Sequence, residues 1–123
     1  MPGDEEKLID VLVPKAKVWL ELDGELILGR GGALLLRAIE EHGSISQALK
    51  AIPDDVLGEM ETPSYRFAWG YLRKVEDRLG APIVEKRRGH REGPGGTALT
   101  RLGRELLKKY EVYEEKLHQI LSE

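Results

Sequence analysis

The sequence predicts a mainly α domain with small β elements: a winged helix-turn-helix with an N-terminal β-hairpin and a long C-terminal helix. Residues 62–79 carry apolar side chains at helical spacing, with basic and aromatic residues off that stripe. A basic, glycine-rich stretch at 82–99 then has the pattern of a β-hairpin. A basic-faced helix followed by a basic hairpin is typical of a winged-helix DNA-binding domain. We therefore divide the chain into a DNA-binding unit at 1–99 and a dimerisation helix at 100–123.

Length and composition limit the class of protein. The chain has 123 residues, enough for one compact domain, and 41% hydrophobic with 33% charged residues indicates a soluble globular protein. The absence of cysteine excludes disulfide frameworks, thiolate zinc sites and thiol nucleophiles, and it agrees with a reducing compartment. No signal peptide and no long apolar run is present. We therefore expect a cytoplasmic protein with no membrane partner.

The charge is distributed unevenly along the chain. Its net value is −3, which by itself argues against a nucleic-acid partner. However, residues 64–104 carry 10 basic and 4 acidic side chains, whereas residues 1–63 carry 6 basic and 13 acidic ones. Phosphate senses the field within a Debye length, about 8 Å at physiological salt, rather than the total charge. The basic block therefore indicates a phosphate-binding surface, and the alternative is a chance cluster on a solvated face.

The N-terminal part is expected to hold a short helix and a hairpin. Residues 1–14 have the pattern of one or two helical turns, and we assign them no role. Residues 15–29 alternate as a half-buried strand, turn at Asp23-Gly24 and return. Trp19 in the first strand is either a ligand-binding aromatic or, more commonly, a core or interface residue.

The next segment has the pattern of the first half of a helix-turn-helix. Gly29-Arg30-Gly31-Gly32 lacks a Walker pattern, so we interpret it as a flexible lead into a helix at 32–42, with Arg30 near a phosphate. Gly43 ends that helix, and Ser44 and Gln47 have the spacing of a capping box that begins another. The first turn of such a helix commonly faces phosphate, which makes Ser44, Ser46 and Gln47 candidate contacts. The segment 53–61 carries four acidic residues and no basic one, so it is expected to fold away from DNA.

The stretch 62–79 is the candidate recognition helix. Ala68, Leu72, Val75 and Leu79 form its apolar stripe, and Gly80 is its expected stop. Trp69 is expected in the core rather than as a base-stacking platform. We expect base readout from Ser64, Arg66, Tyr71 and Arg73. We expect phosphate contacts mainly from Lys74, Lys86, Arg87, Arg88 and Arg91. The predicted DNA surface also includes Tyr65, Phe67 and His90.

The last helix has the spacing of a coiled-coil seam. Thr100 is its expected cap, and apolar residues follow at steps of four, three, four and three: Leu106, Tyr110, Tyr113, Leu117 and Ile120. The seam predicts a homodimer. The alternative is a helix that folds back on its own domain.

The chain resembles the N-terminal DNA-binding domain of the molybdate-responsive regulators, ModE. The motifs that carry the resemblance are Gly43-Ser44-Ile45-Ser46-Gln47, Ser64-Tyr65 with Ala68-Trp69, and Gly89 followed by Gly93-Pro94-Gly95-Gly96-Thr97-Ala98-Leu99-Thr100. The run from Leu72 to Val84 is similar more broadly to LysR-type winged helices. The resemblance covers about residues 30–121. It implies a DNA-binding winged helix with a long dimerising helix, with Ser64, Tyr65 and Arg66 at the groove-facing helix start and Arg91 on the wing.

Two departures from the family pattern are visible. The segment from Ala48 to Pro63, between the second-helix motif and the recognition helix, has sixteen residues and is longer than in the family. No molybdate-binding domain follows within the 123 residues. We therefore expect no molybdate response from this chain, no cofactor and no small-molecule effector.

Three classes of function are weighed. The leading one is a dimeric, sequence-specific regulator that binds double-stranded DNA. The alternative is a winged-helix protein-interaction module with weak non-specific DNA binding, which the acidic segment and the net charge of −3 favour. An enzyme is not expected, because His42, His90 and His118 have no metal-ligand spacing and no nucleophile or carboxylate pair stands in a catalytic context. No catalytic and no metal residue is assigned.

Overall fold

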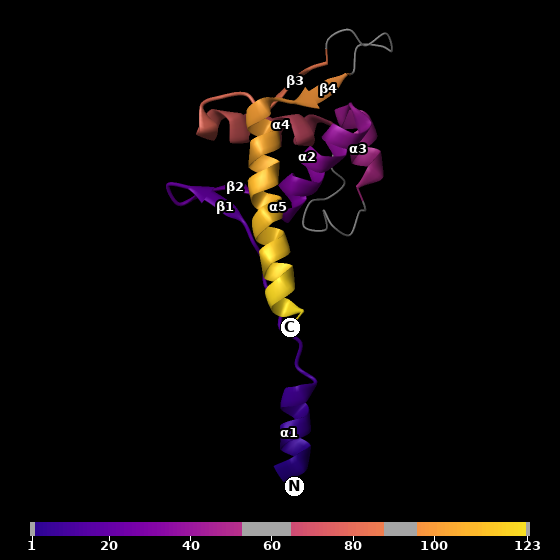
Figure 1. Ribbon diagram of the computed structural model, residues 1–123. Helices are drawn as coiled ribbons and strands as arrows, with labels where there is room; N and C mark the ends of the chain where they lie inside the picture. The colour runs from indigo at the N-terminus through magenta and orange to yellow at the C-terminus, as the bar shows by residue number, and fades with distance from the viewer. Residues whose placement is uncertain (1, 53–64, 88–95, 123) are drawn as a thin grey trace.

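The computed structural model describes residues 2–52, 65–87 and 96–122 (Figure 1). This part of the chain is mainly helical, with two small two-stranded antiparallel sheets and a long last helix. The order is α1 Pro2–Asp10, β1 Leu20–Leu22, β2 Glu25–Leu28, α2 Arg30–His42, α3 Ile45–Ala51, α4 Tyr65–Leu79, β3 Val84–Lys86, β4 Thr97–Leu99 and α5 Arg101–Leu121.

The N-terminal hairpin is confirmed, with a shorter first strand than predicted. Its turn places Asp23 and Gly24 at φ values of 51° and 82°, the left-handed conformation that an Asp-Gly pair tolerates. The pairing shifts register between Leu20 and Glu21. Ile27 and Leu28 of β2 are buried, so the hairpin packs on the helices through its second strand.

Helix α2 is the centre of the core. It buries Leu35, Leu36 and Ile39, and it ends at Gly43, whose φ of 72° allows its N–H to donate to the Ile39 carbonyl at 2.8 Å. The expected flexible lead into this helix is wrong, because Arg30 to Gly32 are already its first turn. Gly32 is required by packing rather than by flexibility, since a Cβ there would collide with the hydroxyl of Tyr71.

Helices α3 and α4 follow the predicted patterns. The Ser44 hydroxyl accepts a hydrogen bond from the Gln47 N–H at 3.0 Å, so the predicted cap of α3 is confirmed. Helix α4 buries Ala68, Leu72 and Val75, and Gly80 ends it at a φ of 75°. The predicted helix start at 62–64 and the acidic segment 53–61 lie outside the described residues.

Strands β3 and β4 form the predicted hairpin, paired from Val84↔Leu99 to Lys86↔Thr97. Ile83, Val84 and Leu99 are buried against the helices. The N–H of Thr97 donates to the carbonyl of Gly43 at 2.8 Å. This bond attaches the hairpin to the turn between α2 and α3.

Helix α5 begins at the predicted cap, because the Thr100 hydroxyl accepts from the Gly103 N–H at 3.1 Å. Its first half packs on the body through Leu107 and Tyr110. Figure 1 shows that the C-terminal end of α5 projects beyond α2, α3 and α4, and that α1 lies still further out in the same direction. Within the described residues, no helix is long and apolar enough to cross a membrane.

Candidate nucleic-acid interface

One face of α4 points away from the core. Arg66, Gly70 and Arg73 follow one another by four and three residues, opposite the buried stripe, and all three are exposed together with Lys74. This arrangement follows from the helical repeat. Because Ala68, Leu72 and Val75 are buried against the core, the opposite face of α4 is turned toward solvent. The structure therefore brings three of the predicted contacts, Arg66, Arg73 and Lys74, onto one exposed surface.

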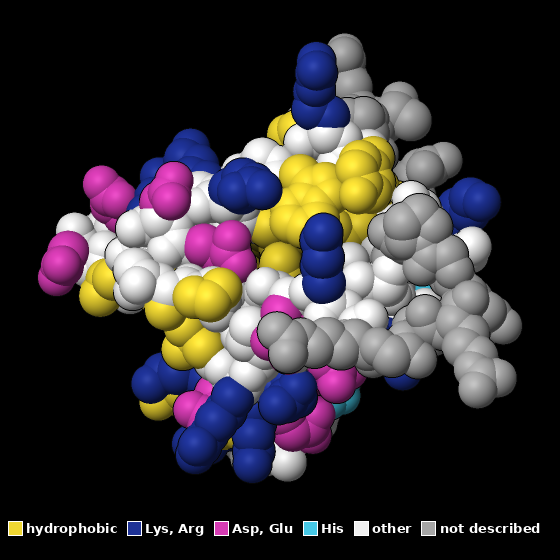
Figure 2. Space-filling model, turned by 90° about the horizontal axis from the view of Figure 1, so that it is seen from above, with side chains coloured by type: hydrophobic (Ala, Val, Ile, Leu, Met, Phe, Trp, Pro, Cys, Tyr) yellow, Lys and Arg dark blue, Asp and Glu magenta, His cyan; other side chains and the backbone are white. Residues whose placement is uncertain are grey.

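Aromatic side chains lie beside these cations. Tyr65 is 53% exposed, and its ring meets that of Trp69 edge to face, with centroids 6.2 Å apart and planes at 72°. The guanidinium carbon of Arg73 lies 5.6 Å from the centre of the Trp69 ring, within cation–π distance. Trp69 itself is half-buried and packs against the core, as expected. Figure 2, seen from above, shows hydrophobic side chains gathered on this end of the molecule with Lys and Arg around them.

Tyr71 differs from the expectation that it reads bases. Its hydroxyl donates to the carbonyl of Ile27 at 3.3 Å, which links α4 to β2. Burial raises the pKa of this hydroxyl from 10.0 to about 12. Tyr71 is buried because its side of α4 is covered by the N-terminal hairpin and by the first turn of α2 at Gly32. Tyr71 therefore holds the helix in place from inside.

The β3–β4 hairpin brings two further cations to this end of the molecule. Lys86 and Arg87 are exposed, and the N–H of Arg87 donates to the Gly96 carbonyl at 3.0 Å. The Arg87 guanidinium lies over Gly43, so closely that a Cβ there would collide with its Nη1. Gly43 directly precedes Ser44, the N-cap of α3, so the guanidinium lies next to the start of α3. There Ser44 is half-buried and Ser46 and Gln47 are exposed.

Four predicted DNA contacts, Ser64, Arg88, His90 and Arg91, lie outside the described residues. Phe67 is within them and is exposed on the flank of α4 opposite Trp69.

The predicted seam of α5 is divided between two environments. Tyr110 differs from the prediction, because it is 2% exposed in the core of its own chain, and burial together with the nearby Glu114 carboxylate raises its pKa. Leu106 is half-buried against the same core and Leu117 is half-buried. Tyr113 and Ile120 are 47% and 64% exposed. The seam thus turns from the protein body to solvent as the helix proceeds.

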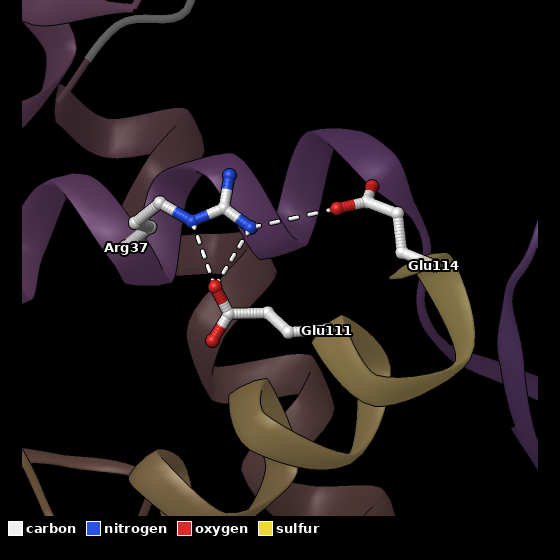
Figure 3. Close-up of polar contacts among 3 residues, drawn as sticks. All are labelled: Arg37, Glu111 and Glu114. Carbon is white, nitrogen blue, oxygen red and sulfur yellow. Dashed lines mark hydrogen bonds and ion pairs between the residues drawn. The ribbon is translucent and has the colours of Figure 1, made fainter. Parts of the chain in front are cut away.

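An ion pair links α2 to α5 (Figure 3). Arg37 of α2 points between two carboxylates of α5, with its Nε and Nη2 at 3.1 Å and 3.0 Å from Glu111 Oε2 and Nη2 at 3.7 Å from Glu114 Oε1. All three side chains are partly exposed, so the pair contributes at most about 1 kcal/mol to stability. The pair joins α2 to the side of α5 that carries Glu111 and Glu114.

Several of these contacts had no local signal in the sequence. The Arg37–Glu111 pair joins residues far apart in the chain, and so do the contacts of Gly32 with Tyr71 and of Gly43 with Arg87. The sequence shows Gly32 and Gly43 but does not indicate which residues approach them. Among the described residues, no three His, Asp or Glu side chains gather as a metal site would require.

Comparison with known proteins gives sequence relatives. The chain is 33% identical over 107 residues to the molybdenum transport protein ModE of Azotobacter vinelandii, which covers 87% of this chain. It is 32% identical over 95 residues, 77% of this chain, to the transcriptional regulator ModE of Haemophilus influenzae and to the molybdenum-pterin-binding protein MopB of Rhodobacter capsulatus. The chain is a relative of the ModE proteins.

The relationship to the ModE proteins covers most of this chain but a minor part of each relative. The chain spans 36% of the Azotobacter protein, 33% of the Haemophilus protein and 32% of the Rhodobacter protein. No protein-family model matches the chain.

Proposed function

We propose that this chain is a winged helix-turn-helix protein that binds double-stranded DNA sequence-specifically and regulates transcription as a homodimer. The observation that carries the proposal is the exposed cationic face of α4, which stands at the same end of the molecule as strand β3, where Lys86 and the following Arg87 are exposed. In this assignment, α3 and α4 are the helix-turn-helix, with α4 as the recognition helix, and β3–β4 is the wing. The kinship with proteins named as a transcriptional regulator and as ModE supports the regulatory role.

The contacts divide by chemistry. Arg66 and Arg73 stand on the outward line of α4, where a helix in the major groove meets base edges, and a guanidinium can pair with guanine through two hydrogen bonds. Lys74, Lys86 and Arg87 lie to the sides and suit phosphates, as do Ser46 and Gln47 at the start of α3. Tyr71 is left out of this set, because its hydroxyl is engaged with Ile27.

The dimer is proposed through one apolar line of α5, formed by the exposed Tyr113 and Ile120 with the half-buried Leu117 between them. The apolar side chains of α1 and the residues after it are 65–71% exposed in the single chain and lie beyond the end of α5, which adds area for a second copy. A two-fold dimer implies a pseudo-palindromic site whose half-sites are one helical turn or a multiple apart.

The test is fluorescence anisotropy with a pool of random duplexes, titrated at several salt concentrations and combined with competitive selection. We expect binding that weakens steeply with salt, because several counterions are released, and enrichment of a palindrome. Arg66→Ala should cost about 1–3 kcal/mol of binding and relax specificity at one position. Lys17→Ala, which removes an exposed cation outside α4, is the matched control and should change affinity little.

Two results would contradict parts of the proposal. If no binding survives at about 50 mM salt, the cationic face is not a phosphate surface. The exposed apolar residues of α1 would then favour the alternative, a protein-interaction module. If Arg66→Ala weakens binding to all sequences equally, Arg66 contacts phosphate rather than bases.

A further inference from the structure

Helix α4 carries a glycine that the fold does not need. Gly70 lies in the middle of the helix and is exposed, and a Cβ built there would meet no atom within 4 Å. Glycine inside a helix is less favourable than alanine, because it loses more backbone freedom on folding. The folded chain alone would therefore favour alanine at this position.

Two other helical glycines, Gly32 and Gly103, have an internal reason. A Cβ at Gly32 would collide with the Tyr71 hydroxyl, and a Cβ at Gly103 would collide with the carbonyl oxygen of Ile83. Both lie where two elements approach closely. Among the described residues Gly70 has no such neighbour, so the packing seen there gives no internal reason for a glycine, and a close approach to a different molecule would give one.

The surroundings of Gly70 indicate which molecule. Arg66 precedes it by four residues and Arg73 follows it by three, so one cation lies on each side along the outward line. Arg73 is drawn sideways over the Trp69 ring, at 5.6 Å. The result is a patch of bare helix backbone framed by two guanidinium groups, which suits an anionic partner that a helix can approach closely.

We propose that Gly70 is a positioning residue of the DNA interface, where the missing side chain lets the backbone of α4 approach base edges on the floor of the major groove. The inference rests on the DNA-binding role proposed above. The major groove is about 12 Å wide and a helix with its side chains about 10–12 Å across, so one added methyl group on the leading face matters. A closer approach of α4 to the DNA also shortens the distance that the side chains of Arg66 and Arg73 must span to reach the bases.

The experiment compares Gly70→Ala and Gly70→Leu with the unchanged chain and with Gly3→Ala. Gly3 is also a helical, exposed glycine whose Cβ would meet nothing within 4 Å, but it lies in α1 and serves as the matched control. Melting temperature and affinity for the selected duplex are both measured. Gly70→Ala should raise the melting temperature by a few degrees. It should also weaken binding by about tenfold, comparable to losing one base contact, and Gly70→Leu should weaken it further.

Gly70→Ala is expected to stabilise the fold and to weaken DNA binding. A purely structural role for Gly70 would not produce both changes. If Gly70→Ala binds as tightly as the unchanged chain, or if it lowers the melting temperature, the inference is wrong while the DNA-binding proposal stands. If Gly3→Ala weakens binding as much as Gly70→Ala, the effect is not local to α4 and the inference is also wrong. If the unchanged chain does not bind duplex DNA, the proposed function fails first and the role of Gly70 fails with it.

Discussion

The close approach of α5 to the residue before β3 allows a quantitative test of the packing. The backbone of Gly103 stands against Ile83, where a Cβ would lie 3.1 Å from the carbonyl carbon and would collide with the oxygen. The same oxygen accepts the Thr100 N–H at 2.9 Å, at the start of α5. Gly103→Ala must therefore push the helix off the strand or break that bond.

The magnitude for Gly103→Ala follows from three contributions. Overpacking a close contact costs about 1–3 kcal/mol. Loss of the hydrogen bond to Ile83 adds about 1 kcal/mol, and the better helix propensity of alanine returns at most about 1 kcal/mol. The net expectation is a loss of about 2 kcal/mol in the free energy of unfolding. For a chain of this length, that lowers the melting temperature by roughly 6–12 °C.

The assay is urea and thermal unfolding followed by circular dichroism, at one fixed protein concentration because a dimer makes stability concentration-dependent. Gly70→Ala is the matched control, since it is the same substitution in a helix without the close neighbour, and it should increase stability. A Gly103→Ala variant as stable as the unchanged chain would refute the reasoning, because the contact could then yield without cost.

Two further predictions concern Tyr71 and the α5 surface. Because burial raises the pKa of Tyr71 from 10.0 to about 12, the unfolded chain releases this proton first, and stability is lost as pH rises from 10 to 12. Tyr71→Phe should lose less stability over that interval in urea unfolding and should bind DNA unchanged; an equal alkaline loss in both chains would contradict the burial argument. Tyr113→Glu places a charge on the exposed part of the α5 seam and should shift the dimer to monomer in sedimentation experiments, whereas Lys108→Glu, an exposed change on the side of α5 away from the seam, should not. An unchanged dimer in Tyr113→Glu would place the interface elsewhere.

The sequence determined the features that depend on neighbours within a few residues. The Asp23-Gly24 turn, the Ser44 and Thr100 caps and the stops at Gly43 and Gly80 occur where the pattern predicted them. Each is a local matter, in which one side chain or one left-handed residue satisfies nearby backbone groups. The apolar stripe of α4 was predictable for a related reason, because a repeat of 3.6 residues fixes which side chains share a face.

Only the tertiary structure decided what covers the sides of those helices. Tyr71 stands beside the apolar stripe of α4 and Tyr110 belongs to the apolar line of α5, and periodicity cannot say whether such a side chain meets solvent, a second copy or another element of its own chain. The N-terminal hairpin covers the flank with Tyr71, and the packing of α5 on the body covers Tyr110. Gly32, Gly70 and Gly103 look alike in the sequence, yet two stand at close contacts and one faces open space. Such differences come from contacts between residues far apart in the chain, which a local pattern does not encode.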